Sequence, residues 1–269
     1  MSINFDRNRT QVTFELLAGY SPQDPPAEKK RKLRNYVLTP GDLKQLEITL
    51  EEDAIDFFYN GLVSFIEGIN AAESKRFSWA VIKLYYSIYY MLRATLASNG
   101  TAILREGKLF RLSLVAGSSP VDNGVSSTHK GTIIHYCTIF PNDKLLSNNI
   151  EGMTTYEWML EAREIINYRS VTFKEPGNLN IWDKFVKGID GGTIGELLCT
   201  LENDPNFVYC FQEEYAIVGI PIKCIRNTID DFSRKGIIKR LNQTRIDYTR
   251  NLLNSSLCKL NIPTSIFIQ

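Results

Sequence analysis

One long helix with an aromatic face limits the folds open to this chain. Between Arg76 and Gly100, apolar and aromatic residues recur at steps of three and four, the spacing that keeps side chains on one side of an α-helix. They are Trp79, Ile82, Tyr85, Tyr86, Tyr89, Tyr90, Leu92 and Leu96. So wide a stripe predicts a helix that is buried on most sides, as in a helical bundle.

The tyrosines in this stripe are an unusual choice for a core. A core built for stability alone favours Leu or Ile, because each buried tyrosine hydroxyl needs a hydrogen-bond partner. Two interpretations remain open. Either the tyrosines line the edge of an ordinary core, or some of their hydroxyls, with Arg93, face charged groups on a neighbouring helix.

A second helical segment supplies such groups. Residues 161–168 read EAREIINY and lie in an otherwise apolar segment. In an α-helix Arg163 and Asn167 are four apart, as are Glu164 and Tyr168, so two polar pairs occupy adjoining faces. A guanidinium suits bidentate contact with phosphate, which is the functional hypothesis for Arg163. A structural ion pair between Arg163 and a carboxylate of another helix is the alternative.

Together the two segments resemble the HEPN-like helical-bundle family (higher eukaryotes and prokaryotes nucleotide-binding). Family members share a YYS-x-YY-x-LRA-x-L helix and a later helix with R-E-x-x-D/N-Y, which match residues 85–96 and 163–168. The resemblance implies a mainly α-helical protein with a HEPN-like four-helix bundle. Because the family is rich in RNA-cleaving toxins and antiviral effectors, it also implies a role in a prokaryotic antiviral defence or toxin–antitoxin system.

The resemblance further implies a composite site, at a dimer interface, that acts on RNA without a metal. Its predicted catalytic residues are Arg163, Asn167, Tyr168 and Arg169. Ribonuclease members carry a histidine shortly after the arginine, whereas both histidines of this chain, His129 and His135, precede it. The group whose pKa best suits proton transfer near neutral pH is therefore missing from that window. The leading interpretation is a non-catalytic, nucleic-acid-binding assembly or sensing subunit, with a metal-independent ribonuclease as the alternative.

The composition limits which cellular compartment and which cofactors we expect for this protein. The chain has no apolar run as long as a membrane span, and residues 1–11 lack the apolar core of a signal peptide. The five cysteines are odd in number and include no CxxC pair, which indicates reduced thiols rather than a zinc site or a disulfide framework. We therefore expect a cytoplasmic protein without membrane association. No metal or cofactor is predicted, since the chain has no phosphate-binding glycine loop.

Hydrophobic periodicity divides the chain into three parts. Residues 1–45 are predicted to form an arm, residues 46–176 the HEPN-like bundle, and residues 177–269 a second module. The arm would hold a short strand at 10–17 and a loop with a basic run at 29–34. The bundle would hold helices near 53–72, 76–98, 130–140 and 155–173, with a small β-hairpin inserted at 101–115.

The C-terminal module resembles a winged helix-turn-helix, an α+β fold. Gly219 would make the turn, Pro221 would start the recognition helix and Gly236 would end it. Strands at 237–241 and 245–249 would form the wing. Residues 221–260 include nine basic residues and only three acidic ones, and this local excess of positive charge favours contact with RNA or DNA. The predicted nucleic-acid contacts are Lys223, Arg226, Asn227, Lys239 and Arg240.

Two further alternatives concern partners. A winged helix can also serve protein contacts or dimerisation, and by itself would suit a DNA-binding transcription regulator. The predicted partners are thus RNA or DNA, together with a second copy of the chain or a partner protein of a defence system.

Overall fold

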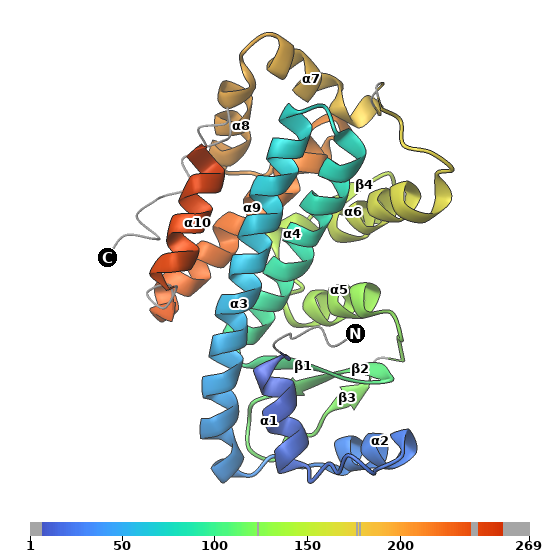
Figure 1. Ribbon diagram of the computed structural model, residues 1–269, viewed down its shortest axis with the longest axis vertical. Coiled ribbons are helices and arrows are strands. Elements are labelled where there is room, and N and C mark those ends of the chain that lie inside the picture. Colours follow the sequence, from blue (N-terminus) through green and yellow to red (C-terminus); the bar gives the residue numbers. More distant parts are fainter. Residues whose placement is uncertain (1–6, 123, 176, 178, 238–241, 255–269) are drawn as a thin grey trace. The chain divides into compact units, whose positions relative to one another are not determined.

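The computed structural model of the chain describes residues 7–122, 124–175, 177, 179–237 and 242–254. This part is mainly helical, as predicted (Figure 1). Its α-helices are α1 (Arg9–Leu17), α2 (Pro26–Asn35), α3 (Pro40–Glu73), α4 (Phe77–Ser98), α5 (Thr128–Ile139), α6 (Thr155–Glu164), α7 (Asp183–Asp190), α8 (Ile194–Asn203), α9 (Glu213–Lys235) and α10 (Gln243–Asn254). Its strands are β1 (Thr101–Glu106), β2 (Lys108–Ser113), β3 (Val121–Asp122), β4 (Asn149–Ile150) and β5 (Met153–Thr154).

The chain forms two compact units that share the helices α3 and α4. Unit 1 comprises the described residues up to Phe57 together with Leu92–Ile139. Unit 2 comprises Phe58–Met91 and the described residues from Phe140 onward. The division therefore cuts both long helices, and it does not follow the ranges 1–45, 46–176 and 177–269.

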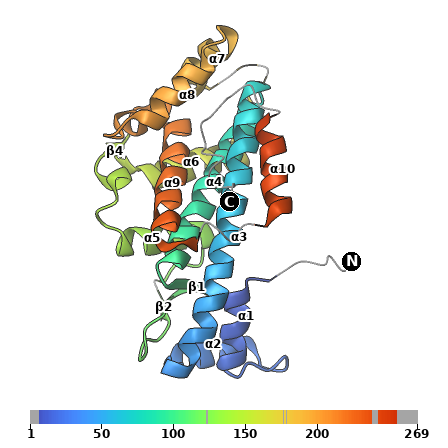
Figure 2. The ribbon, with the colours of Figure 1, turned by 90° about the vertical axis from the view of Figure 1, so that its left-hand side faces the viewer.

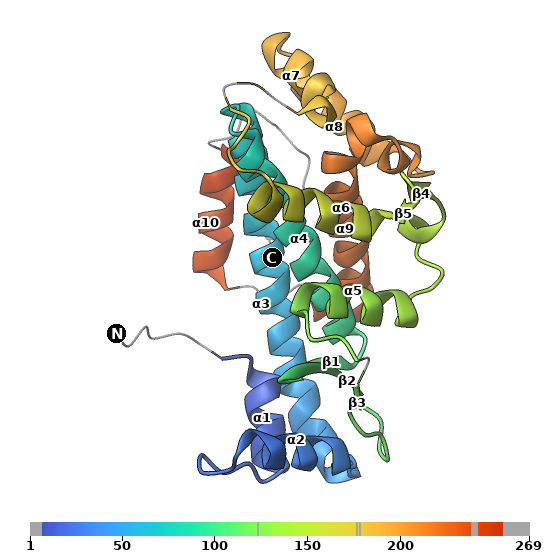
Figure 3. The ribbon, with the colours of Figure 1, turned by 90° about the vertical axis from the view of Figure 1, so that its right-hand side faces the viewer.

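Unit 1 contains an antiparallel sheet of order β1-β2-β3. The predicted hairpin is confirmed, because β1 pairs with β2 from Thr101↔Ser113 to Glu106↔Lys108. Gly107 connects the two strands with a φ of 68°, in the left-handed region that glycine adopts without strain. Helix α5 contacts β2, while α1 and α2 contact β1 on the other side of the sheet (Figures 1 and 3).

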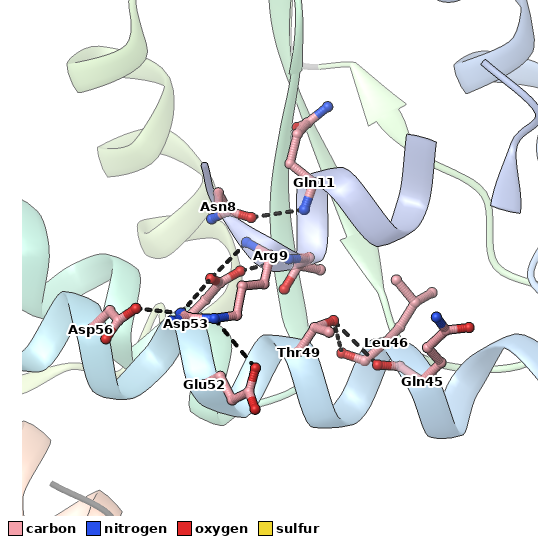
Figure 4. Close-up of polar contacts among 10 residues, drawn as sticks. Asn8, Arg9, Gln11, Gln45, Leu46, Thr49, Glu52, Asp53 and Asp56 are labelled. Atoms are coloured by element: carbon pink, nitrogen blue, oxygen red, sulfur yellow. Dashed lines mark hydrogen bonds and ion pairs between the residues drawn. The ribbon is translucent and has the colours of Figure 1, made fainter. Parts of the chain in front are cut away.

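The strand predicted at residues 10–17 is wrong, because this segment is helix α1. Side chains accept hydrogen bonds from its free N-terminal amides, which stabilises the helix start. Asn8 accepts a hydrogen bond from the Gln11 amide at 2.8 Å, and Asp53 of α3 accepts from the Arg9 and Thr10 amides at 2.9 and 2.8 Å (Figure 4). Local β-propensity is thus outweighed by capping from a residue far along the chain.

The basic run at residues 29–34 also lies in a helix, α2, rather than in a loop. The helix begins at Pro26, where proline suits the first turn because that turn has no intrahelical donor to lose. Leu33 is fully buried, so one face of α2 belongs to the core of unit 1. Arg31 and Arg34 are exposed, whereas Lys29, Lys30 and Lys32 are half-buried.

Unit 2 is built around α9, which contacts α6, α7 and α8 (Figures 2 and 3). The predicted turn at Gly219 is wrong, since one helix of 23 residues runs through Gly219 and Pro221. Residues 216–225 are all buried, and this burial offsets the hydrogen bond that Pro221 cannot donate. Gly236 ends the helix with a φ of 70°, as predicted.

The strand predicted at 245–249 is also wrong, because these residues belong to α10. The other predicted strand falls mostly on residues 238–241, outside the described residues. The described C-terminal segment therefore shows neither the helix-turn-helix nor the wing strand at 245–249. In the described ranges, no helix is both long enough and apolar enough to cross a bilayer.

Candidate functional site

The chain changes its helix type at the end of α6. Residues 165–169 form a π-helix, in which the Ser170 amide donates to the Ile165 carbonyl oxygen at 2.8 Å. A π turn takes one residue more than an α turn, so residues five apart face each other. The four-residue pairing predicted for this segment is therefore wrong. Tyr168 faces Arg163 instead of Glu164, and Asn167 is exposed.

Arg163 is buried among three tyrosines, with only 6% of its surface exposed. Its Nη2 atom lies 3.3 Å from the Tyr86 hydroxyl and 3.2 Å from the Tyr168 hydroxyl. The guanidinium carbon lies 5.0 Å from the ring centre of Tyr168 and 5.7 Å from those of Tyr85 and Tyr86. The interpretation that tyrosine hydroxyls of α4 face a charged group on another helix is thus confirmed for Tyr86.

Arg163 has no carboxylate partner among the described residues. The carboxylates nearest in sequence are bound by Arg169, which pairs with Glu161 at 3.1 Å and with Glu164 at 3.7 Å. The structural ion pair considered for Arg163 is accordingly not formed within this part of the chain. We call Arg163, Tyr85, Tyr86 and Tyr168 the Arg163 cluster.

The charge of the Arg163 cluster is a net positive one. Burial raises the pKa of Tyr85, which keeps that phenol neutral. Burial lowers the pKa of Arg163, but the hydrogen bond to Tyr86 and the surrounding phenol oxygens raise that pKa by more, so the guanidinium stays charged. Within the described ranges, the cation is contacted by hydroxyl dipoles and by the negative faces of aromatic rings.

One wall of the Arg163 cluster lies at the surface. Tyr168 is 70% exposed, whereas Arg163 behind it is almost covered. A buried charge without a counter-ion costs free energy, and a bound anion would remove that cost.

The structure separates the four predicted catalytic residues into two sets. It brings Arg163 and Tyr168 together at the cluster. Asn167 points to solvent, and Arg169 is bound by the two glutamates on its own segment. The π-helix is the reason, because it rotates every position after Glu164 relative to an α-helix.

The exposed recognition face predicted for Lys223, Arg226 and Asn227 is wrong. Lys223 is only 4% exposed, and its Nζ donates to the carbonyl oxygens of Glu202 at 2.7 Å and Asp204 at 2.6 Å. Arg226 is half-buried and paired with the Glu202 carboxylate, and Asn227 is half-buried. These side chains face the core because α9 is buried on most sides. Lys239 and Arg240 lie outside the described residues.

Both histidines belong to α5 of unit 1, and unit 2 contains none. His129 stands at the start of α5, as expected for a polar helix start. His135 is 3% exposed, and burial lowers its pKa to about 4. Among the residues that the structure describes, no three His, Cys, Asp or Glu side chains gather closely enough to hold a metal ion.

The sequence did not predict several of the residues that make these contacts. Glu202 and Asp204 hold Lys223, and their carbonyl oxygens carry no sequence signal. Arg93 was placed with the tyrosines, but it belongs to unit 1, where its guanidinium lies 4.1 Å from the ring centre of Phe57. The five-residue step from Arg163 to Tyr168 was visible, but only a π-helix makes it a contact.

Comparison of the chain with protein-family models, with curated proteins and with solved structures gave no match. The HEPN-like resemblance therefore rests on the residues quoted for it.

Proposed function

We propose that this protein binds RNA through the Arg163 cluster and serves as a non-catalytic sensing or assembly subunit of a prokaryotic antiviral defence or toxin–antitoxin system. The observation that carries the proposal is the buried Arg163 guanidinium, which no carboxylate of the described residues neutralises. A phosphodiester supplies the missing negative charge, and its oxygens match the fork of guanidinium donors. The defence role is the part that the family resemblance implies.

The tyrosines suit a single-stranded ligand. Single-stranded RNA presents unstacked bases, which bind to proteins by stacking on aromatic side chains. Tyr168 is exposed beside the cation, so one ring can meet a base while Arg163 meets the neighbouring phosphate. This arrangement favours single strands over duplex, because bases inside a duplex offer no free face.

Binding is proposed rather than cleavage because of the groups around Arg163. RNA cleavage needs a group that accepts a proton from the attacking hydroxyl near neutral pH. The groups that contact Arg163 among the described residues are phenols, and unit 2 has no histidine.

The test is fluorescence anisotropy of a labelled, short single-stranded RNA at low salt. Arg163→Ala is expected to weaken binding by about tenfold or more, because a charge-assisted bidentate contact is lost. Arg163→Lys is expected to restore only part of the affinity, since lysine keeps the charge without the planar fork. Arg234→Ala is the matched control, as it removes an arginine of unit 2 that is 76% exposed and lies outside the cluster.

Two outcomes would count against the proposal. Equal binding by wild type and Arg163→Ala would place any RNA contact elsewhere. Metal-independent cutting of the RNA by wild type, lost in Arg163→Ala, would make the protein a ribonuclease instead of a binding subunit.

The subunit role has a separate test. Co-expression with the products of neighbouring genes, followed by size-exclusion chromatography, is expected to give a defined complex. A chain that stays monomeric with each of them contradicts the assembly role and leaves RNA binding to be judged by the anisotropy test.

A further inference from the structure

Unit 2 contains a pocket of about 470 Å³ beside the π-helix. Its walls come from the β4–β5 hairpin, from α6 and the π-helix, from residues 174 and 179–181, and from the first residue of α9. Helix α6 contacts β4, β5 and α9, which holds these walls together (Figure 3). The volume falls within the roughly 300–1,000 Å³ that is usual for small-molecule pockets. We call it the unit 2 pocket.

Aliphatic side chains form much of the wall of the unit 2 pocket. They are Met153, Ile165, Ile166, Leu179 and Ile181. Ile165 is 42% exposed and three of the others are half-buried, so apolar surface remains in contact with water. Covering such surface is favourable in proportion to the area removed from water. The pocket therefore suits a ligand with an aliphatic group.

The unit 2 pocket also carries charges of both signs. Lys174 and Glu213 line it, and both residues are exposed. Neither side chain has an ion pair or a hydrogen bond to any other described residue, and the two do not pair with each other. A ligand with one cationic and one anionic group would satisfy both charges, whereas a ligand with a single charge would leave one of them unpaired.

The two other carboxylates of the unit 2 pocket already have donors. Arg169 binds Glu161 at 3.1 Å, and the indole nitrogen of Trp158 donates to Glu151 at 2.9 Å. Of the three carboxylates that line the pocket, Glu213 is therefore the one without a donor in the described part of the chain. It suits an ammonium group.

We propose that the unit 2 pocket binds a free amino acid with an aliphatic side chain. The ammonium group of the ligand pairs with Glu213 and its carboxylate with Lys174, while its side chain lies against the aliphatic wall. Hydrogen bonds between charged groups are roughly twice as strong as neutral ones, so the two ends fix the orientation of the ligand. The site shares no residue with the Arg163 cluster, and its test needs no RNA.

The test is an NMR titration of the isotope-labelled full chain with L-leucine and two analogues. Leucinamide keeps the ammonium group but lacks the carboxylate, and isocaproate keeps the carboxylate but lacks the ammonium group. Wild type is expected to bind L-leucine at least about tenfold more tightly than either analogue, because each analogue leaves one charge of the pocket unpaired. The indole signal of Trp158, which lines the pocket, is expected to shift on binding.

Two substitutions test the two charges separately. Lys174→Met is expected to weaken binding of L-leucine by about tenfold or more and to leave leucinamide unaffected, because leucinamide has no carboxylate. Glu213→Gln is expected to weaken L-leucine and leucinamide alike and to leave isocaproate unaffected. Both residues are exposed, so the fold should be kept, which circular dichroism verifies.

Glu214→Gln is the matched control. Glu214 is the next residue of α9 and is also exposed, but it pairs with Lys184 at 3.5 Å and does not line the pocket. The affinity of this variant for L-leucine should equal that of wild type.

Three results would overturn the proposal. L-leucine does not bind wild type at millimolar concentration, or it binds with an affinity that neither Lys174→Met nor Glu213→Gln changes. In the third, one of the two analogues binds as tightly as L-leucine, which would make the pocket a site for a single charge and not for an amino acid.

Discussion

The ammonium group of Lys223 donates a hydrogen bond of 2.6 Å to the backbone carbonyl oxygen of Asp204. A second hydrogen bond joins it to the carbonyl oxygen of Glu202, and the ring centre of Phe207 lies 5.0 Å away. A lysine at this place connects α9 to the end of α8. Lys223 is therefore a structural cation. For this reason the number of basic residues in and after α9 does not give the charge on the surface of this segment.

Lys223→Ala is expected to lower the free energy of unfolding by about 2–4 kcal/mol, because one buried and one half-buried carbonyl oxygen lose their donor and a cavity is left. Chemical denaturation followed by circular dichroism measures this. Lys187→Ala, which removes an exposed lysine of α7, serves as the control and should change stability by less than about 0.5 kcal/mol. An unchanged denaturation midpoint for Lys223→Ala would contradict the structural role.

Arg163→Met is expected to leave thermal stability unchanged or to raise it. Among the residues that the structure describes, this buried charge has no carboxylate counter-ion, so replacing it by an apolar side chain of similar length removes a desolvation cost, and methionine can still contact the tyrosine rings. Differential scanning calorimetry gives the comparison. A loss of about 3 kcal/mol or more would mean that a carboxylate had been left buried and unpaired, and so that Arg163 is a structural ion-pair residue.

The buried His135 is expected to make the free energy of unfolding depend on pH. Burial, and to a smaller extent the nearby Arg111, lower its pKa to about 4 from the ordinary 6.5, while Asp122 acts in the opposite direction. Between these two values the unfolded chain binds a proton that the folded chain does not, so the free energy of unfolding falls as the pH falls. The contribution is fully present above pH 6.5 and is reduced by about 2 kcal/mol near pH 5.

Denaturant unfolding of wild type and His135→Gln at both ends of this range tests the dependence. The variant should lose less stability on acidification than wild type does. An NMR titration that placed the ring pKa of the folded protein near 6.5 would show that the prediction is wrong.

Gly68 of α3 marks the close approach of α4 within unit 2. A Cβ at this position would lie 2.8 Å from Cγ of Leu84 and 3.3 Å from its backbone nitrogen. Gly68→Ala is therefore expected to destabilise the protein by about 1–3 kcal/mol, since a packed helix has to shift. Gly195→Ala in α8, where a Cβ meets nothing within 4 Å, should instead stabilise it by up to about 1 kcal/mol. Equal effects of the two substitutions on the denaturation midpoint would contradict this packing.

Long periodic segments were predictable from the sequence, and positions set by distant contacts were not. The helix of residues 76–98 and the hairpin at 101–115 follow from local spacing, and both are confirmed as α4 and the β1–β2 pair. Residues 10–17 carry β-branched side chains and read as a strand, but Asp53 caps them as a helix. Gly219 and Pro221 read as a turn, but burial of α9 keeps the helix continuous.

The same distinction applies to the candidate site. The sequence indicates Arg163 and Tyr168 as site residues by their residue type. It indicates the tyrosines of α4 because so many of them occur in one helix. It does not indicate their partners, because the pairing depends on the helix type after Glu164 and on which carboxylates Arg169 binds.

The π-helix at residues 165–169 also has a consequence for changes in chain length. Such a segment is equivalent to an α-helix that has gained one residue, so removal of Ile165 alone would return the segment to an ordinary α-helical ladder. Arg163 and the tyrosine that follows it would then be four apart, on the same α-helical face. A single-codon deletion would thus remove the π-helix while keeping the tyrosine on the same face as Arg163 and leaving every amino acid that the cluster uses in the chain.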